Sequence, residues 1–227
     1  MERYLRNKSS IDEHQQNILS KKHVIVLGCG GLGGSVAESL SRIGVGKLTL
    51  VDNDVFVLSN LNRQRFSTNN TIGQSKVEVA KEKLFDINDQ VEVITHKKFI
   101  DSSNIYTLVD GCDLVIDALD NFETRRMIED ADLDVPIISA AVGGYNGWLT
   151  ISKPGYRNIK HLCSNANKGV EQILGNLSFT VNVLAELEVS LAIRTLLGEE
   201  VSLHGFYFVD LKTLEIEKID IIESFAV

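Results

Sequence analysis

The sequence predicts an α/β fold in which a doubly wound, mostly parallel sheet is extended by antiparallel strands at its C-terminal end. Short runs rich in β-branched residues alternate with segments of helical spacing as far as residue 141, a pattern typical of a parallel sheet covered on both faces. A glycine-rich turn separates the first run from the first helical segment. Beyond residue 141 a strand, a long apolar helix and a closing hairpin replace this alternation.

The parallel part of the sheet is predicted by five short runs. In chain order they are His23–Leu27, Lys47–Val51, Val91–Thr95, Leu114–Ile116 and Ile137–Ala141. The two clearest helices between them carry apolar residues three or four positions apart, so that each can cover the sheet with one face. These residues are Leu32, Val36, Leu40 and Ile43 in the first helix and Val77, Ala80, Leu84 and Ile87 in the second.

The antiparallel part begins with Asn146–Ile151, a strand expected to follow a Gly-Gly-Tyr-Asn turn. Phe206–Asp210 and Leu214–Ile219 predict a closing hairpin. Between them, residues 177–197 predict a long apolar helix that ends at Gly198. We expect a buried or interface helix rather than a membrane span, because charged residues interrupt the segment and each central carboxylate would cost about 2.5–3.5 kcal/mol in a bilayer.

The 227 residues are expected to form one domain over 1–227. In it, residues 1–22 form an N-terminal arm and helix, 153–175 a polar crossover-type loop, and 176–227 the long helix with the hairpin.

The charge balance and the cysteines restrict the class of protein. With 23 Lys+Arg against 31 Asp+Glu the net charge is −8, which argues against nucleic acid or an anionic membrane as a partner. Cys29, Cys112 and Cys163 are too few and too scattered for a disulfide framework, which indicates a reducing, cytoplasmic location. The charged start, MERYLRNKSS, predicts no cleavable signal.

The turn GCGGLG after the first strand places glycines at Gly28, Gly30, Gly31 and Gly33, and the next strand is followed by Asp52. Such a turn lets the backbone approach a phosphate at a helix N-terminus, and the acid can accept hydrogen bonds from ribose hydroxyls. This arrangement predicts a Rossmann-like nucleotide site. The alternative is a glycine turn needed only for packing.

A polar segment directly after Asp52 favours ATP over a nicotinamide dinucleotide. It contains Asp54, Asn60, Arg63 and Gln64 and emerges at the strand ends where ligands of doubly wound sheets bind. Chemistry at a triphosphate needs cations and usually Mg²⁺ to hold the developing charge, and a dinucleotide needs few cations.

Two further groups complete the candidate site. Lys76 stands in the first turn of a helix, where it opposes the helix dipole; it is either a tolerated surface lysine or a phosphate ligand. Asp117 and Asp120 follow the fourth strand. A turn cap for Asp117 and an N-cap of the helix from Asn121 for Asp120 are the alternatives, and we favour Asp120 as a Mg²⁺ ligand.

Five motifs in order resemble the ThiF/MoeB/HesA adenylyltransferases, the prokaryotic relatives of ubiquitin-activating enzymes. They are Arg3-Tyr4-Leu5-Arg6, GCGGLG, DNDVFVLSNLNRQ, GQSK and DALDN. The resemblance implies that ATP and Mg²⁺ are used to adenylate the C-terminal glycine carboxylate of a small ubiquitin-like sulfur carrier ending in Gly-Gly, releasing pyrophosphate. The pathway would be biosynthesis of a sulfur-containing cofactor of the thiamine or molybdopterin type.

The resemblance also implies roles for individual residues. The nucleotide-binding set is Gly28, Gly30, Gly31, Gly33, Asp52, Asp54, Asn60, Arg63, Gln64 and Lys76. The catalytic set is Arg63, Lys76, the magnesium ligand Asp120, and Arg6, which would reach the partner subunit's site in a homodimer. No general base is needed, because the attacking carboxylate is already ionised at neutral pH.

The chain departs from the family pattern in two ways. Many relatives bind structural zinc with two Cys-x-x-Cys pairs; this chain has no such pair, so we expect no zinc site. Cys163 is the only cysteine in the crossover-type loop. It is either a nucleophile or sulfur-relay residue or, as we favour, an incidental thiol, while Cys29 and Cys112 are interpreted as structural.

Other functions stay open on the sequence. Within the family, the acceptor is alternatively a ribosomal peptide or a tRNA base. From another class, an NAD(P)-dependent oxidoreductase would share the glycine turn and Asp52 but would give no reason for the cationic residues and Asp120 together. A non-catalytic nucleotide-binding scaffold is the third possibility.

Overall fold

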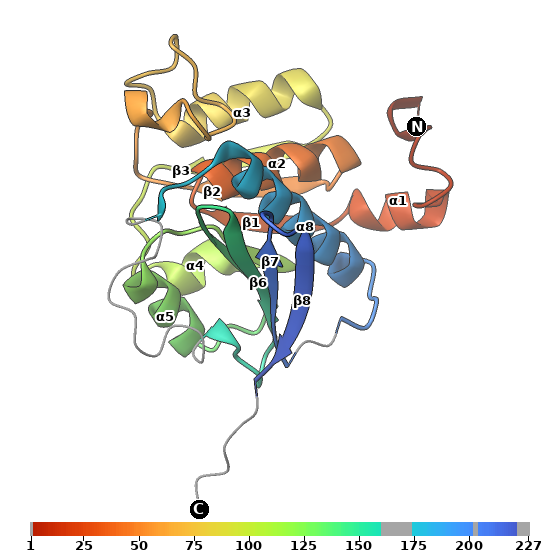
Figure 1. Cartoon of the computed structure of the whole chain (residues 1–227). Coiled ribbons are helices and arrows are strands. Elements are labelled where there is room, and N and C mark those ends of the chain that lie inside the picture. The colour runs from red at the N-terminus through yellow and green to blue at the C-terminus, as the bar shows by residue number, and fades with distance from the viewer. Residues whose placement is uncertain (1, 160–173, 202–203, 222–227) are drawn as a thin grey trace, which may run out of the picture.

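The computed structural model describes residues 2–159, 174–201 and 204–221. Its centre is one eight-stranded sheet with the strand order β3-β2-β1-β4-β5-β6-β7-β8 (Figure 1). The strands are β1 (His23–Leu27), β2 (Lys47–Val51), β3 (Glu92–His96), β4 (Leu114–Asp117), β5 (Ile137–Gly143), β6 (Asn146–Ser152), β7 (Gly205–Asp210) and β8 (Glu215–Asp220). The first five pair in parallel and the last three join in antiparallel register. The predicted fold class is therefore confirmed.

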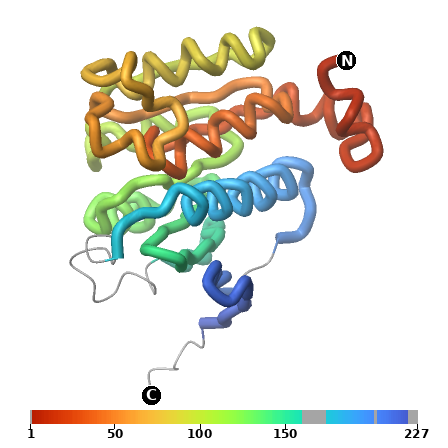
Figure 2. The backbone as a smooth tube through the Cα atoms, turned by 45° about the horizontal axis from the view of Figure 1, so that its top comes forward, coloured from red at the N-terminus to blue at the C-terminus, as the bar shows by residue number. Residues whose placement is uncertain are grey.

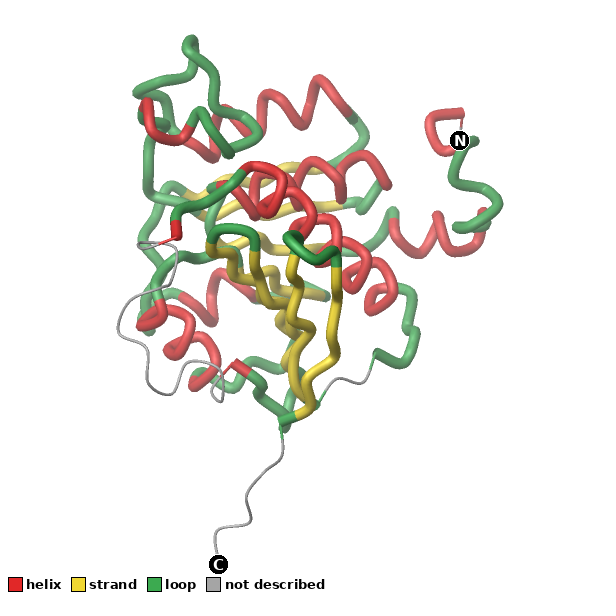
Figure 3. The backbone as a smooth tube through the Cα atoms, in the orientation of Figure 1, coloured by secondary structure: helices red, strands yellow, loops and turns green. Residues whose placement is uncertain are grey.

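Helices lie on both faces of the sheet (Figure 3). They are η1 (Glu2–Tyr4), α1 (Glu13–Leu19), α2 (Gly31–Ile43), η2 (Leu58–Asn60), α3 (Lys76–Ile87), α4 (Ile105–Val109), α5 (Phe122–Asp130) and α8 (Ser178–Leu196). Figure 2 shows α3, α2 and α8 side by side, and their apolar residues share one core with the sheet. A second core fills the space between the sheet and α4 with α5.

Helix α8 runs close to the predicted range, and Gly198 just beyond it adopts the left-handed conformation, with φ of +78°. Its side chains pack on the sheet and on α2, and Glu188 is fully buried among them. Among the described residues, no helix is long and apolar enough to cross a membrane.

The N-terminal arm is fastened to the ends of α2 and α3. The Arg3 guanidinium binds the Asp89 carboxylate at 2.9 Å, and the Asn88 amide donates to the Tyr4 hydroxyl at 2.8 Å. The Tyr4 ring fills the space that a Cβ would need at Gly44, which ends α2 in the left-handed conformation. The arm is thus ordered against its own chain as far as Tyr4.

Most of the crossover-type loop, including Cys163, lies outside the described residues. The assignment of residues 1–227 to a single domain therefore stays a prediction.

Candidate active site

A cavity of about 580 Å³ opens at the carboxyl ends of the parallel strands, where ligands of doubly wound sheets bind. The predicted residues around it come from four segments that are distant in sequence: the turn after β1, the end of β2 with the polar segment that follows, the start of α3, and the end of β4. The predicted site residues that line it are Gly28, Gly30, Gly31, Asp52, Asp54, Arg63, Gln64, Lys76 and Asp120.

The glycines of the turn allow a left-handed backbone at Gly28 and close packing of α2 at Gly33. Gly28 has φ of +92°, and a Cβ there would lie 2.8 Å from the Ala118 carbonyl oxygen. A Cβ at Gly33 would lie only 1.8 Å from the Gly28 carbonyl oxygen, so this glycine lets α2 pack against the turn and does not line the cavity. Gly30 is the N-cap of α2. The first amides of α2 consequently face the cavity, an arrangement that favours an anion.

Asp52 is held by the backbone at the end of β2. Its Oδ2 accepts from the Cys29 amide at 2.7 Å, and its Oδ1 accepts from the Asp54 amide at 2.8 Å. These bonds fix the carboxylate next to the glycine turn, which is the position expected for a ribose ligand.

Lys76 is buried, contrary to the alternative of a surface lysine. Its side chain is 8% exposed, and Nζ lies 2.8 Å from Asp54 and 3.9 Å from Asp52. A buried ammonium needs such partners, and the two carboxylates hold the Lys76 side chain beside the cavity. Because the Asp54 side chain is 60% exposed, an incoming phosphate can share this ammonium.

The residues of the polar segment after Asp52 have different roles in the structure. Arg63 lines the cavity while its Nη1 donates to the Ser59 carbonyl at 3.1 Å and to the Asn62 side chain at 2.9 Å. Gln64 is buried, and its Oε1 has no hydrogen-bond partner among the described residues. Asn60 does not line the cavity: its Oδ1 accepts from the Val57 amide at 3.0 Å and closes η2. Asn60 therefore stabilises the backbone of this segment and lies outside the cavity lining.

Asp120 is exposed at the mouth of the cavity and forms no hydrogen bond or ion pair with another described residue. Asn121, not Asp120, caps α5, since its Oδ1 accepts from the Thr124 amide at 2.7 Å. A free carboxylate and the Gln64 amide oxygen are oxygen ligands of the kind that Mg²⁺ takes, together with phosphates and water. In the described part of the chain, no three His, Cys, Asp or Glu residues gather into a metal site.

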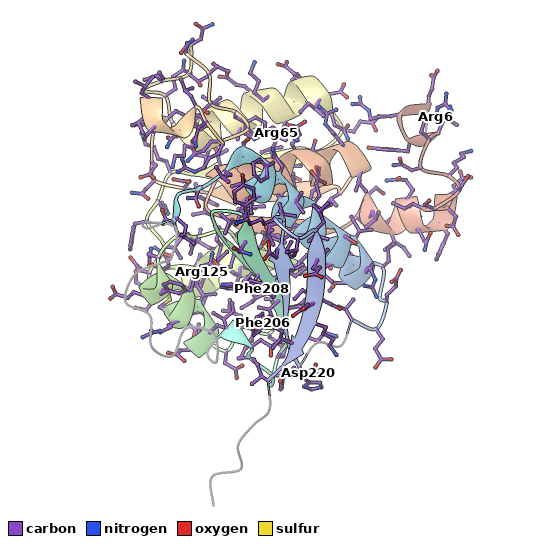
Figure 4. The ribbon with its side chains drawn as sticks, viewed as in Figure 1. Arg6, Arg65, Arg125, Phe206, Phe208 and Asp220 are labelled. Carbon is purple, nitrogen blue, oxygen red and sulfur yellow. The ribbon has the colours of Figure 1, made fainter. Side chains whose placement is uncertain are left out.

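Arg6 lies far from this cavity. It is exposed on the arm (residues 2–12), whereas Arg125, which lines the cavity, lies at the other side of the molecule (Figure 4). A site built from one chain thus contains no Arg6.

Several cavity residues escaped prediction. Lys98 and Phe99 follow β3, Asn176 precedes α8, and Arg125 stands in the first turns of α5. Arg125 carried a signal in the sequence, because a charged residue on the face that a helix turns to the core requires a buried partner.

The two described cysteines have thiols of low reactivity. Burial raises the pKa of Cys29 well above its usual value, and burial raises that of Cys112 to about 11. The thiolate is the reactive form, so both cysteines fit the structural role predicted for them.

A larger cavity, of about 740 Å³, lies between α4 and α5. Its lining includes Tyr106, Phe122 and Met127, and it has neither a glycine turn nor the open N-terminus of a long helix. The smaller cavity is therefore the better candidate for a nucleotide.

Comparison with known proteins identifies relatives over nearly the whole chain. The ThiF family matches residues 3–225. A Culex quinquefasciatus protein named adenylyltransferase and sulfurtransferase MOCS3 is 34% identical over 207 residues, which cover 87% of this chain and 47% of that protein. The molybdopterin-synthase adenylyltransferase of Escherichia coli K12 is 33% identical over 191 residues, covering 81% of this chain and 76% of the relative.

The same comparison extends to an archaeal protein and to solved structures. The SAMP-activating enzyme E1 of Haloferax volcanii is 33% identical over 202 residues, covering 85% of this chain and 73% of the relative. The structure of E. coli MccB with ATP superposes with a TM-score of 0.83 at 22% identity, covering 100% of this chain and 73% of MccB. This chain spans about half the length of the MOCS3 relative. On the match to 3–225, it belongs to the ThiF family.

Proposed function

We propose that this chain uses ATP and Mg²⁺ to adenylate the C-terminal carboxylate of a small ubiquitin-like sulfur-carrier protein ending in Gly-Gly. The observation that carries the proposal is the meeting of the glycine turn, Asp52, Arg63, Lys76 and Asp120 around one cavity. The names of the MOCS3 and molybdopterin-synthase adenylyltransferase relatives support this reaction class.

The reaction needs positioning and neutralisation of charge. A carboxylate oxygen of the acceptor bonds to the α-phosphorus, the bond from that phosphorus to the bridging oxygen breaks, and pyrophosphate leaves with the electron pair. Two anions must approach each other, so cations and amide donors aimed at the phosphates lower the barrier. Lys76, Arg63 and the amides at the start of α2 are the donors that this chain supplies at the cavity.

Mg²⁺, when bound, would neutralise phosphate charge and hold the triphosphate in one geometry. Asp120 and the Gln64 amide oxygen are the cavity groups that would bind it or its water ligands. Asp52 would hold the ribose, with Gly28, Gly30 and Gly31 letting the backbone approach the phosphates.

Arg6 would complete the site from a second copy of the chain. Because the arm is fastened by Arg3 and Tyr4 to α2 and α3 of its own chain, Arg6 points away from that chain's cavity. We infer a homodimer in which each Arg6 acts on the partner's phosphates as an arginine finger does.

Subunit mixing tests the dimer. Arg6→Ala and Asp120→Ala proteins, each inactive alone, are mixed and allowed to exchange subunits. Action in trans restores activity, because some mixed dimers carry both defects in one site and leave the other intact. Action in cis gives no recovery, and a chain that is monomeric at assay concentration also refutes the dimer.

Exchange of labelled pyrophosphate into ATP tests the function. We expect exchange only when a carrier with a C-terminal Gly-Gly is present, and loss of exchange when the last glycine is removed. Exchange driven instead by a peptide or a tRNA would assign the alternative acceptor. Binding of NADH without binding of ATP would overturn the proposal in favour of an oxidoreductase.

The cytoplasmic location is a further part of the proposal, and it rests on the small number and scattered positions of the cysteines.

A further inference from the structure

A buried ion pair stands directly behind the mouth of the cavity. Asp117 is the last residue of β4, and its side chain is 1% exposed; the Arg125 side chain on α5 is 3% exposed. Arg125 Nη1 lies 3.6 Å from Asp117 Oδ2, which also accepts from the Ser139 hydroxyl at 2.9 Å. Burying two charges is costly, and apolar residues of similar size often stabilise a fold as well. Stability alone therefore does not explain the pair.

Both members of the pair hold the backbone of the same residue, Leu119. Asp117 Oδ1 accepts from the Leu119 amide at 3.2 Å, and Arg125 donates to the Leu119 carbonyl from Nε at 2.9 Å and also from Nη2. Arg125 Nη2 also donates to the Ala140 carbonyl on β5 at 2.8 Å. Leu119 is thus fixed on its N–H and on its C=O. We refer to Asp117 and Arg125 as the Leu119 clamp.

Asp120 comes directly after the clamped residue. Its carboxylate forms no hydrogen bond or ion pair with the rest of the described chain, so no side chain there orients it. The backbone on its N-terminal side is held by the clamp, and on its C-terminal side Asn121 caps α5. These anchors consequently fix the backbone on both sides of Asp120 and, with it, the point and direction at which its side chain leaves the main chain.

An aromatic ring and a second buried acid also interact with the Arg125 guanidinium. Trp148 on β6 offers its ring face, with the centroid 5.4 Å from Cζ. Glu188 on α8 is fully buried, and burial raises the pKa of its carboxyl well above the usual value, while the Arg125 charge opposes this shift. Among the described residues, Asp117 is the acid that forms an ion pair with Arg125.

We propose that Asp117 and Arg125 are positioning residues that aim the Asp120 carboxylate at the metal ion and phosphates. This inference rests on the proposed function, in which Asp120 binds Mg²⁺. A site must hold its ligands within about half an ångström of the productive geometry, and partners behind a metal ligand are typically worth about 10–100-fold in metal affinity or activity.

A double-mutant cycle tests this role. Arg125→Lys keeps the positive charge beside Asp117 but cannot donate from two nitrogens to one carbonyl and reach the next strand. We expect it to lower pyrophosphate exchange about 10–100-fold and to raise the Mg²⁺ concentration for half-maximal rate, with little change in the KM for ATP. In an Asp120→Asn background it should change the rate less than about twofold, because the ligand it positions is already lost.

The outcomes separate this role from the proposed function. If Arg125→Lys lowers the rate equally in both backgrounds, Arg125 does not act through Asp120 and the positioning role is wrong. If Asp120→Asn alone leaves exchange unchanged, Asp120 is not in the site, and the proposed role of Asp120 fails with it. Binding of Mn²⁺ with a non-hydrolysable ATP analogue, measured by electron paramagnetic resonance, should be about 10–100-fold weaker for Arg125→Lys than for the wild type; unchanged Mn²⁺ binding would refute the positioning role.

Two further variants distinguish a loss of positioning from a general loss of folding. Lys22→Gln removes another ion pair, with Asp113 at 2.8 Å and at the opposite end of β1, and should leave exchange and its Mg²⁺ dependence unchanged. Asp117→Asn keeps an acceptor for the Leu119 amide and is measured in the same cycle if Arg125→Lys does not fold. Its loss of rate must also vanish in the Asp120→Asn background, or the clamp is refuted.

Discussion

Glu129 on α5 makes the stability of this protein depend on pH in a calculable way. The residue is 3% exposed, and neither of its carboxylate oxygens has a hydrogen-bond partner among the described residues. Burial raises its pKa from 4.5 to about 7; the Ser152 hydroxyl and the Arg157 guanidinium oppose this shift. The carboxyl is therefore neutral in the folded protein at a pH where the unfolded chain has already released the proton.

The sign and size of the effect follow from linkage. A raised folded pKa gives stability that is fully present below pH 4.5 and is lost as the pH rises toward 7. The two pKa values of 4.5 and about 7 convert to about 3 kcal/mol at about 1.4 kcal/mol per pH unit. Glu129→Gln removes the titration while keeping the shape, so it should match the wild type at pH 4 and exceed it by up to about 3 kcal/mol at pH 8.

Thermal unfolding at both pH values measures this difference. For a chain of this size, about 3 kcal/mol corresponds to roughly 6–12 °C in Tm. Glu123→Gln, on the exposed side of the same helix, is the matched control and should show the same small difference at both pH values. A Glu129→Gln advantage that is equal at pH 4 and pH 8 would show that Glu129 is ionised in the folded protein, contrary to this reasoning.

The remaining predictions concern the site. Lys76→Ala and Arg63→Ala should each lower pyrophosphate exchange about 10²-fold or more, the cost of losing one charge-stabilising donor; unchanged rates would place the phosphates elsewhere. Gly33→Ala should reduce the yield of folded protein, measured by circular dichroism and gel filtration, because its Cβ would lie 1.8 Å from the Gly28 carbonyl oxygen; a native Tm would contradict the packing of α2. Cys163→Ala should leave carrier-dependent exchange intact, since adenylation needs no thiol, and loss of exchange would show that the mechanism is incomplete.

The strands and the site residues at their ends could be predicted from the sequence, because they depend on short stretches of the chain. The bounds of β1 and β2 match the prediction, since β-branched runs between turn residues mark buried parallel strands. The glycine turn, Asp52, Lys76 and Asp120 follow directly from their positions at element ends, and parallel strands bring all such ends to one edge of the sheet. The helix α4 was not predicted, because five residues are too few to show a helical period.

The roles of other motif residues depend on which hydrogen-bond partner each side chain has in the folded protein. Asn60 belongs to the same motif as Arg63, yet the Asn60 amide oxygen accepts from the Val57 backbone, and of these two residues Arg63 alone lines the cavity. The motif alone cannot tell these roles apart, because a hydrogen bond three residues back leaves no trace in residue type.

The parallel strands, the nucleotide-type turn and the family could be predicted from the sequence, since hydrophobic period, glycine positions and charged motifs are properties of the chain. The pairing of the polar groups became visible in the folded structure. Lys76 is shared between Asp52 and Asp54, burial raises the pKa of Glu188, and Arg125 clamps Leu119 from a separate helix. The reason is physical: the free energy of a charge depends on its burial and its neighbours, and both exist only after the chain has folded.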